Sequence, residues 1–431
     1  MIGISHRLLG GTIDGGAFPR PEGRLRRSLR CPSKHCLALI GCLALPVAAQ
    51  THTAGDDAAP AFSLHGFGTL GLARSSTDQA EFVRDLSQPG GLSKRWSSKI
   101  DSVFGIQADI QAASGVNVIA QGVSRYHSDG SFTPELTWAF VKVDPNQNLS
   151  LRGGRLGTEF YMLADSRLVG FSYLPIRPPN DYYGALPFSY IDGVDGAATL
   201  PLGTGLLRAK LFSGLTREKA PLSSLEWDMN RSRLSGGHLD YQQGAWQWRI
   251  GYAQIRFDRD LPLQSLHSQL EAFGAVAASQ ALSVADKLGR FTSAGVVYDS
   301  GPLQAQLMLS RTKQESAVFE NSHAGYAIVG YRFDELTPFV GYSWTKSAPK
   351  QLATGLGAGV DAVVARVMAD SHSDQHTLFL GLRWDFHRDM ALKVQVDAVR
   401  GTPQSIFPTR WETAAYNGRM NIFSLALDFV F

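Results

Sequence analysis

The chain has few cysteines and no long apolar run. Its three cysteines, Cys31, Cys36 and Cys42, all lie within the first 49 of 431 residues. The rest of the chain therefore cannot form a disulfide or a thiolate metal site. No apolar run reaches the roughly 18 residues that a transmembrane helix needs, so any membrane crossing must use strands. His372 and His376 are four residues apart, but they precede a strand in a loop, and neither a metal nor a cofactor is predicted.

The first part of the chain has the layout of a secretory signal peptide. A basic stretch over residues 24–34 precedes the apolar run Cys36–Val47, and two small residues, Ala48 and Ala49, follow. This order is typical of a signal peptide with cleavage after Ala49. A lipid-anchored Cys42 is the alternative, because residues 39–42 resemble a lipobox. The expected organisation is a cleaved extension with signal peptide at 1–49, a short periplasmic linker at 50–60 and a folded domain at 61–431.

Cleavage changes the charge balance. The whole chain has 41 basic and 38 acidic residues and a net charge of +3. Seven of the basic and two of the acidic residues lie in the first 49 residues. The rest of the chain therefore has 34 basic and 36 acidic residues and a net charge near −2. A slightly acidic protein has no electrostatic basis for binding nucleic acid, and no nucleic-acid partner is predicted.

Strand-like segments recur from residue 62 to the last residue. Short turns rich in Gly, Pro, Asp and Asn alternate with long loops between them. An even number of strands, with short turns at one end and long loops at the other, is typical of a bacterial outer-membrane barrel. The sixteen predicted strands are Phe62–Ala73, Lys99–Ala112, Val116–Tyr126, Glu135–Val143, Asn148–Leu156, Tyr190–Leu200, Leu206–Leu215, Arg233–Gln242, Trp246–Phe257, Phe291–Asp299, Leu303–Thr312, His323–Phe333, Thr337–Lys346, Gln375–Phe386, Met390–Val399 and Met420–Phe431.

The side chains within these segments alternate between apolar and polar. In Met390–Val399, the apolar Val394 and Val396 oppose Lys393 and Asp397. Successive side chains of a strand point to opposite faces, so each strand has one apolar and one polar face. Charges on one face of a closed sheet must point at water, because lipid would penalise them. The fold class is therefore all-β, a transmembrane antiparallel barrel with an aqueous lumen. Val116–Tyr126 and Trp246–Phe257 fit the alternation poorly, which a bulge or an exposed strand end would explain.

The third long loop, Gly157–Ser189, is unusually apolar for a connection. Loops of this length and character are usually buried or functional, so we expect it to fold into the lumen and narrow the pore. The alternative is that it covers the mouth of the barrel or contacts a neighbouring subunit. The candidate pore-lining residues, in this loop and on the strands around it, are Arg152, Arg155, Asp165, Arg167, Arg177, Asp181, Arg208, Lys210, Arg383, Lys393 and Asp397.

Three parts of the chain resemble the Gram-negative porins with sixteen strands. They are the first strand segment 62–71, the stretch Leu151–Leu156 before the third long loop, and the terminal Phe431. The resemblance implies a homotrimer in the outer membrane, in contact with lipopolysaccharide, with one water-filled pore per subunit for small hydrophilic solutes. It also implies that Phe431 is the signal read by the barrel-assembly machinery. Two features depart from the family: the third loop lacks the Pro-Glu-Phe-Phe-Gly type motif, and His65 stands where an aromatic residue is common.

The function predicted from these features is passive diffusion of small hydrophilic solutes or ions, without a covalent step. Both signs of charge occur among the candidate lining residues, with a modest lean towards anions from the basic ones. A substrate-specific channel, an outer-membrane barrel enzyme and an adhesin are the alternatives. An enzyme is not expected, because no histidine lies in a recognisable nucleophile motif. The connection 258–290 also shows helical spacing at Leu266, Leu270, Phe273 and Ala277.

Overall fold

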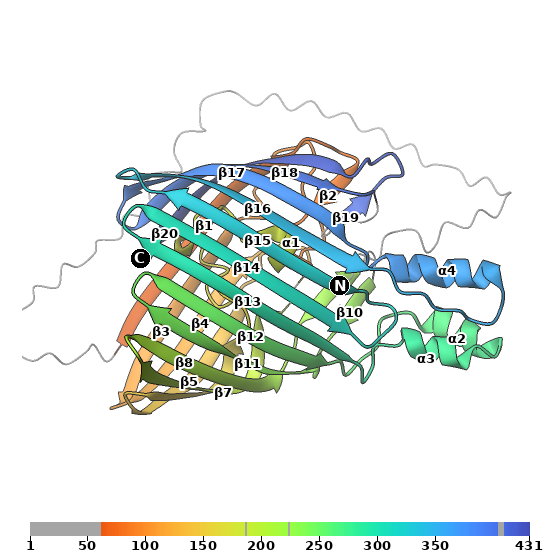
Figure 1. Cartoon of the computed structure of the whole chain (residues 1–431), viewed down its shortest axis with the longest axis horizontal. Coiled ribbons are helices and arrows are strands. Elements are labelled where there is room, and N and C mark those ends of the chain that lie inside the picture. The colour runs from red at the N-terminus through yellow and green to blue at the C-terminus, as the bar shows by residue number, and fades with distance from the viewer. Residues whose placement is uncertain (1–61, 186–187, 223–224, 404–408) are drawn as a thin grey trace, which may run out of the picture. The chain divides into compact units, whose positions relative to one another are not determined.

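A computed structural model describes residues 62–185, 188–222, 225–403 and 409–431, and the expected signal peptide and linker lie outside these ranges. Sixteen strands form one closed antiparallel barrel (Figure 1). They are β1 (Phe62–Ser75), β3 (Val103–Ala113), β4 (Val116–Arg125), β5 (Glu135–Asn146), β6 (Leu149–Gly157), β7 (Tyr190–Leu202), β8 (Gly205–Leu215), β11 (Arg233–Gln243), β12 (Trp246–Arg256), β13 (Leu288–Ser300), β14 (Leu303–Gln314), β15 (Asn321–Tyr331), β16 (Leu336–Ala348), β17 (Asp374–His387), β18 (Met390–Gly401) and β20 (Arg419–Val430).

The first and last barrel strands pair with each other and close the sheet. The β1–β20 register runs from Phe67 opposite Val430 to Ser75 opposite Ile422. Beyond it, the amide of Gly66 donates to the carbonyl of Phe431 at 2.8 Å, and the amide of Phe431 donates back at 3.0 Å. Closure leaves no strand edge of the barrel unpaired, which a lipid environment requires. The predicted antiparallel barrel of about sixteen strands is confirmed.

Burial alternates along the strands in the predicted sense. In β18 the side chains of Lys393 and Asp397 are buried, whereas Val394 is 44% exposed. In β20 Phe423 and Leu425 are exposed and Ser424 is buried. Large apolar side chains thus cover the outer face of the barrel, and polar side chains occupy the inner face. This is the distribution expected when lipid surrounds the sheet and water fills it.

The two strands that fit the alternation poorly have different explanations. In β4, Ile119 and Gln121 are both buried on the inner face, ahead of the register shift between Gln121 and Gly122, and Ile119 belongs to the apolar cluster that includes Phe160. In β12 the exception is Arg256, which lies at the end of the strand opposite Arg233 of β11, on the exposed outer face. A charged residue is tolerated there because it lies beyond the apolar part of the strand.

The long connections carry further short elements. Two small sheets of two strands each lie in these connections. One pairs β2 (Ala80–Phe82) with the distant β19 (Thr409–Glu412), and the other pairs β9 (Lys219–Leu222) with β10 (Leu225–Asp228). The predicted helical spacing in 258–290 is confirmed as α2 (Gln264–Ala272) and α3 (Val276–Leu282). These two helices and α4 (Ala358–Ala369), which was not predicted, project beyond one end of the barrel (Figure 1). None of the helices in the described ranges is long and apolar enough to cross a membrane.

Candidate pore-lining site

The connection between β6 and β7, of which the structure describes residues 158–185 and 188–189, packs against the inner face of the wall and is called the third loop below. It contains the 3-10 turn η2 (Gly170–Ser172) and the short helix α1 (Asn180–Tyr183). Ser293 of β13 donates its hydroxyl to the carbonyl of Phe160 at 3.2 Å. Arg249 of β12 donates to the carbonyl of Tyr161 at 3.0 Å. Side chains of the wall thus satisfy the backbone of the loop.

An aromatic cluster holds the middle of the third loop. The hydroxyls of Tyr183 and Tyr326 of β15 lie 2.9 Å apart, and Tyr183 also donates to the carbonyl of Met162 at 2.8 Å. The rings of Tyr182 and Tyr326 meet edge to face at a centroid distance of 5.2 Å. Phe160 meets Phe291 of β13 in the same way at 5.3 Å. Edge-to-face pairs of this kind add to the stabilisation from burial, so the apolar character of the loop serves its packing against the wall.

Arg177 anchors the loop through two buried ion pairs. Its guanidinium lies 2.6 Å from Asp101, just before β3, and 2.7 Å from Asp397 of β18. It also donates to the hydroxyl of Ser424 of β20 at 2.6 Å. All three charged side chains are buried. A buried charge is tolerated only when it is paired and hydrogen-bonded, and here each acid has the same arginine as its partner.

Two further predicted residues fasten the loop on the same side of the barrel. The buried Asp181 accepts hydrogen bonds from Ser343 of β16, at 2.6 Å, and from Gln375 of β17. Lys393 of β18 is fully buried; its ammonium lies 2.9 Å from Asp428 and donates to the carbonyl of Gly170 at 2.7 Å.

Arg383 of β17 makes the third contact of this group. It pairs with Asp385 at 2.7 Å and donates to the carbonyl of Phe171 at 2.7 Å. The predicted residues on β17 and β18 therefore hold the third loop to the wall, and their charges are engaged in that contact. Sequence alternation placed them on the inner face but gave no indication of this anchoring role.

A second group of charges lies on the β6–β8 part of the wall. Arg152 contacts Asp195 at 2.5 Å and Glu159 at 2.6 Å, and Lys210 contacts the same two acids at 3.1 and 2.7 Å. Burial alone would raise the pKa of Glu159, but the charges of Lys210 and Arg152 outweigh it and lower the pKa to about 2. Arg249 pairs with Asp240 beside this group. The inner wall therefore carries both signs of charge in matched pairs.

The remaining basic candidates lie in three different environments. Arg155 lies on the outer face of β6, because it is three residues from Arg152 and the side chains of a strand alternate; it pairs with Asp192 at 2.7 Å and does not line the lumen. Arg208 is on the inner face of β8 and is exposed. Arg167 is buried in the third loop, where it donates to the hydroxyl of Tyr161 at 3.0 Å.

Asp165 is the candidate of the third loop that faces open space. Its side chain is exposed, and it lines a hollow of about 410 Å³ together with Gln107, Gln121 and Ser166. Asp389 and His65 line the same hollow; Asp389 pairs with Arg388 at 2.9 Å, whereas Asp165 makes no ion pair within the described ranges.

Two histidines contact a serine hydroxyl, and neither has the geometry of a serine–histidine relay. Ser347 and Glu320 both approach the same ring nitrogen of His372, Nδ1, at 3.3 and 2.7 Å. A relay needs the hydroxyl and the carboxylate on opposite ring nitrogens. His267 has Ser279 at 2.9 Å from Nδ1, but Asp260 lies 3.7 Å from Nε2, beyond hydrogen-bond distance, and the buried Ser279 of α3 donates its hydroxyl to Glu271 at 2.9 Å. Within the described ranges no three His, Cys, Asp or Glu side chains are grouped to hold a metal ion.

No family model and no curated protein sequence matches the chain. Solved structures do match. The OmpF porin of Salmonella typhi, in complex with daunomycin, aligns at 12% identity over 86% of this chain and 97% of its own, with a TM-score of 0.52. The chain has the fold of the Gram-negative porins. The anion-selective porin of Comamonas acidovorans aligns at 13% identity over 86% and 99%, and OprB of Pseudomonas putida at 10% over 86% and 94%, both with a TM-score of 0.51. At these identities the likeness to the porins is one of fold.

Proposed function

We propose that the protein is an outer-membrane channel through which small hydrophilic solutes or ions diffuse passively. One observation carries the proposal: a closed barrel of sixteen strands has its exposed apolar side chains outside and its buried ion pairs inside. Such a sheet places water along its axis and lipid around it. Selectivity in such a channel comes from pore width and from the charges at its constriction.

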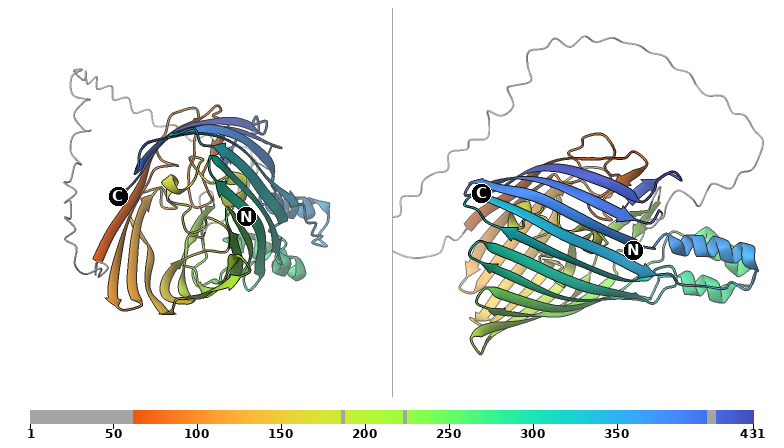
Figure 2. Two further views of the ribbon diagram at one scale, coloured as in Figure 1. Left: turned by 60° about the vertical axis from the view of Figure 1, so that its left-hand side comes forward. Right: turned by 45° about the horizontal axis from the view of Figure 1, so that its top comes forward.

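We infer that the third loop crosses the lumen and narrows it. Near its start, the loop contacts Arg249 of β12 and Ser293 of β13, and further along it contacts Asp397 of β18. Strands β14 to β17 lie between β13 and β18 in the barrel, so the loop reaches from one part of the wall to another. Side chains on the inner face make each of these contacts. Figure 2, left, views the barrel obliquely from one end and shows a short helix and loops among the ring of strands. The alternative, a loop lying over the mouth, would leave buried partners such as Lys393 without their carbonyl acceptors.

We also propose that the channel forms homotrimers in contact with lipopolysaccharide and that the barrel-assembly machinery reads Phe431. The ring of Phe431 is 60% exposed, stacks on Phe104 at 6.5 Å and covers Gly66, where a side chain would collide with it. The ring is therefore presented on the outer face at the seam of the barrel, where a partner can reach it.

The first test is single-channel conductance of the refolded protein in a planar bilayer with a potassium chloride gradient. Stepwise currents with ohmic dependence on voltage are expected, because the proposed pore is open and has no energy-coupling step. The step size should fall below that of an empty sixteen-stranded barrel, since the third loop occupies part of the lumen. A correctly folded, inserted barrel that passes no current would support the adhesin or enzyme alternatives instead.

Asp165 is expected to contribute to the ion preference of the channel. Of the basic residues that suggested a lean towards anions, Arg152 and Lys210 are paired and Arg155 lies outside. Arg208 is exposed on the inner face, so we expect Asp165 and Arg208 to act in opposite directions and the net ion preference to be weak. In D165N the reversal potential should move towards that of anions by several millivolts at a roughly tenfold salt gradient, because one fixed charge at the opening is lost. D286N, at the exposed outer rim, serves as the matched control and should leave the reversal potential unchanged.

A further inference from the structure

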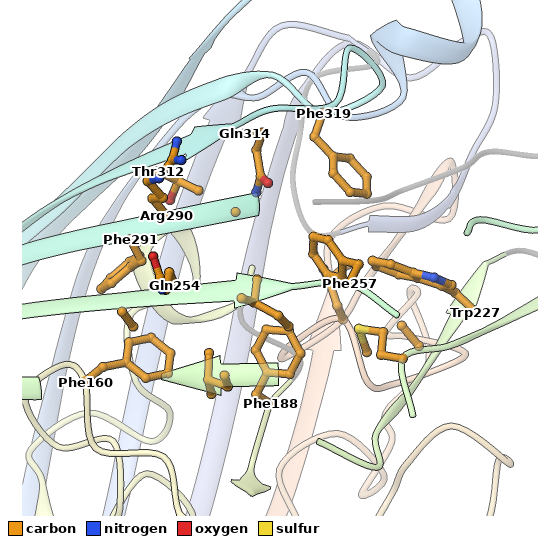
Figure 3. Close-up of a pocket in the computed structure, with 17 residues that line it drawn as sticks. Phe160, Phe188, Trp227, Gln254, Phe257, Arg290, Phe291, Thr312, Gln314 and Phe319 are labelled. Atoms are coloured by element: carbon orange, nitrogen blue, oxygen red, sulfur yellow. The ribbon is translucent and has the colours of Figure 1, made fainter. Parts of the chain in front are cut away.

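An apolar cavity of about 60 Å³ lies inside the barrel, between the third loop and the wall strands β11 to β14 (Figure 3). Phe319, after β14, and the β8–β11 connection close it from the end that carries the long loops. Its aromatic lining consists of Phe160, Phe188, Trp227, Phe257, Phe291 and Phe319. Five separate parts of the chain thus contribute rings to one small space inside the barrel.

Most of the cavity lining is apolar. Its aromatic side chains are all buried, and the aliphatic lining residues Leu234, Ala253 and Met229 are almost fully buried as well. A water molecule needs two or more polar partners, which this apolar part of the lining does not supply. An apolar group that enters it would gain van der Waals contacts with the lining.

One edge of the cavity offers a hydrogen-bonding group. The side-chain amide of Gln314 lines it, near Thr312 of the same strand. Within the described ranges this amide makes no hydrogen bond, although the backbone groups of Gln314 are engaged with Asn321 and Lys350. A primary amide presents both donors and acceptors, so it can bind a carboxylate or an amide but adds no charge.

We propose that this cavity binds the short branched alkyl end of a small amphipathic solute, whose polar end is hydrogen-bonded by Gln314. The size of the cavity selects the alkyl end: an engineered cavity of roughly 150 Å³ in another protein admits benzene, so about 60 Å³ suits a group smaller than an aromatic ring. The inference rests on the proposed channel function and deepens it by naming a class of solute.

Binding is tested without any need for conductance, on the detergent-refolded protein, with isovalerate as the probe and glycerate as the polar analogue of equal charge. Trp227 lines the cavity, so isovalerate should change tryptophan fluorescence in a saturable manner, and the change should be absent in W227F. Glycerate should have no effect, because it would place hydroxyl groups in an apolar space.

The decisive variant is A253V, which adds two methyl groups to a buried wall residue of the cavity. It should raise the isovalerate concentration for half-saturation by roughly tenfold or more, because the alkyl end loses its space. A294V makes the same change on the exposed outer face of the neighbouring strand and should bind as the unmodified protein does. Circular dichroism checks that both variants fold as barrels.

Two results would overturn the inference: no saturable response of the unmodified protein to isovalerate, or equal responses in A253V and A294V. Failure of the channel function is a separate result, seen as absent current in potassium chloride. If both functions hold, isovalerate should also reduce the single-channel current of the unmodified protein and should not reduce that of A253V. In Q314L the discrimination between isovalerate and the uncharged isoamyl alcohol should decrease, because the group that recognises the polar end is gone.

Discussion

Replacing Arg177 by leucine is expected to release the third loop and to raise the single-channel conductance severalfold. The substitution leaves Asp101 and Asp397 buried without their shared partner. Removing one member of a buried ion pair costs about 3–5 kcal/mol, because the remaining charge stays desolvated and unpaired. Here two acids are left instead of one. The loop end that holds Arg177 should leave the wall so that water can reach both carboxylates.

Conductance and limited proteolysis together measure this release. R177L should show larger and noisier current steps, and a protease added from the side of the long loops should cut between residues 158 and 189, where the unmodified protein resists. R311L is the matched control, because Arg311 is exposed on the outer face of β14 and makes no ion pair within the described ranges. Unchanged current steps and an intact loop in R177L would show that the aromatic cluster alone holds the loop.

A triple variant separates the charge effect from the loss of packing. Adding D101N and D397N to R177L removes the stranded charges while keeping side chains of similar shape. Because neutral amides cost far less to bury than carboxylates, this variant should recover much of the protection of the loop. These three residues form one network, so their effects should be strongly non-additive.

The barrel itself could be predicted from local patterns. A strand with one face in lipid and one in water must alternate, and a closed sheet needs short turns at one end; both signals lie within a few residues of one another in the sequence. The segment 390–399 shows this, since its alternation alone placed Lys393 and Asp397 on the inner face. The helix α4 was missed, although Val360, Val364 and Val367 have helical spacing, because the segment was read as one long loop.

The contacts inside the barrel could not be predicted, because they join distant parts of the chain. Arg177 meets Asp101 at a separation of 76 residues and Asp397 at 220. Alternation reveals which face a strand residue occupies, but it does not show which loop residue will lie against it. Arg155 shows that even the face of a strand residue can be predicted wrongly. It was grouped with Arg152 because both are basic, yet their separation of three residues puts them on opposite faces of β6.

Glu218 is expected to make the docking of the long loops depend on pH near neutrality. It follows the end of β8, is buried, and accepts a hydrogen bond from the amide of Ser189 at 2.8 Å. Burial is the largest cause that raises its pKa from 4.5 to about 7, followed by the charge of Glu135, and together they exceed the opposing effects of Arg125, Arg167 and the hydrogen bond from Ser189. In the folded protein, Glu218 is therefore half protonated at a pH where an unfolded glutamate is fully ionised.

The sign of the effect follows from proton binding. Between about pH 4.5 and about pH 7 the folded state binds more protons than the unfolded state, so the free energy of unfolding falls as the pH rises through this range. Above about pH 7 the free energy of unfolding has fallen by its full amount, which is about 3 kcal/mol at most. This is opposite to the usual carboxylate, whose pairing lowers its pKa and stabilises the protein at neutral pH.

The apparent melting temperature of the refolded barrel, followed by circular dichroism from about pH 5 to about pH 8, measures this loss. It should fall by a few degrees over the range. In E218Q the fall should be largely abolished, because the glutamine cannot ionise and still accepts the hydrogen bond from Ser189. E226Q is the control, since Glu226 lies nearby in β10 but is exposed and paired with Lys219. An equal fall in E218Q would assign the pH dependence to other groups, and the buried cluster of Arg125, Glu135 and Asp85 would be the next to test by substitution.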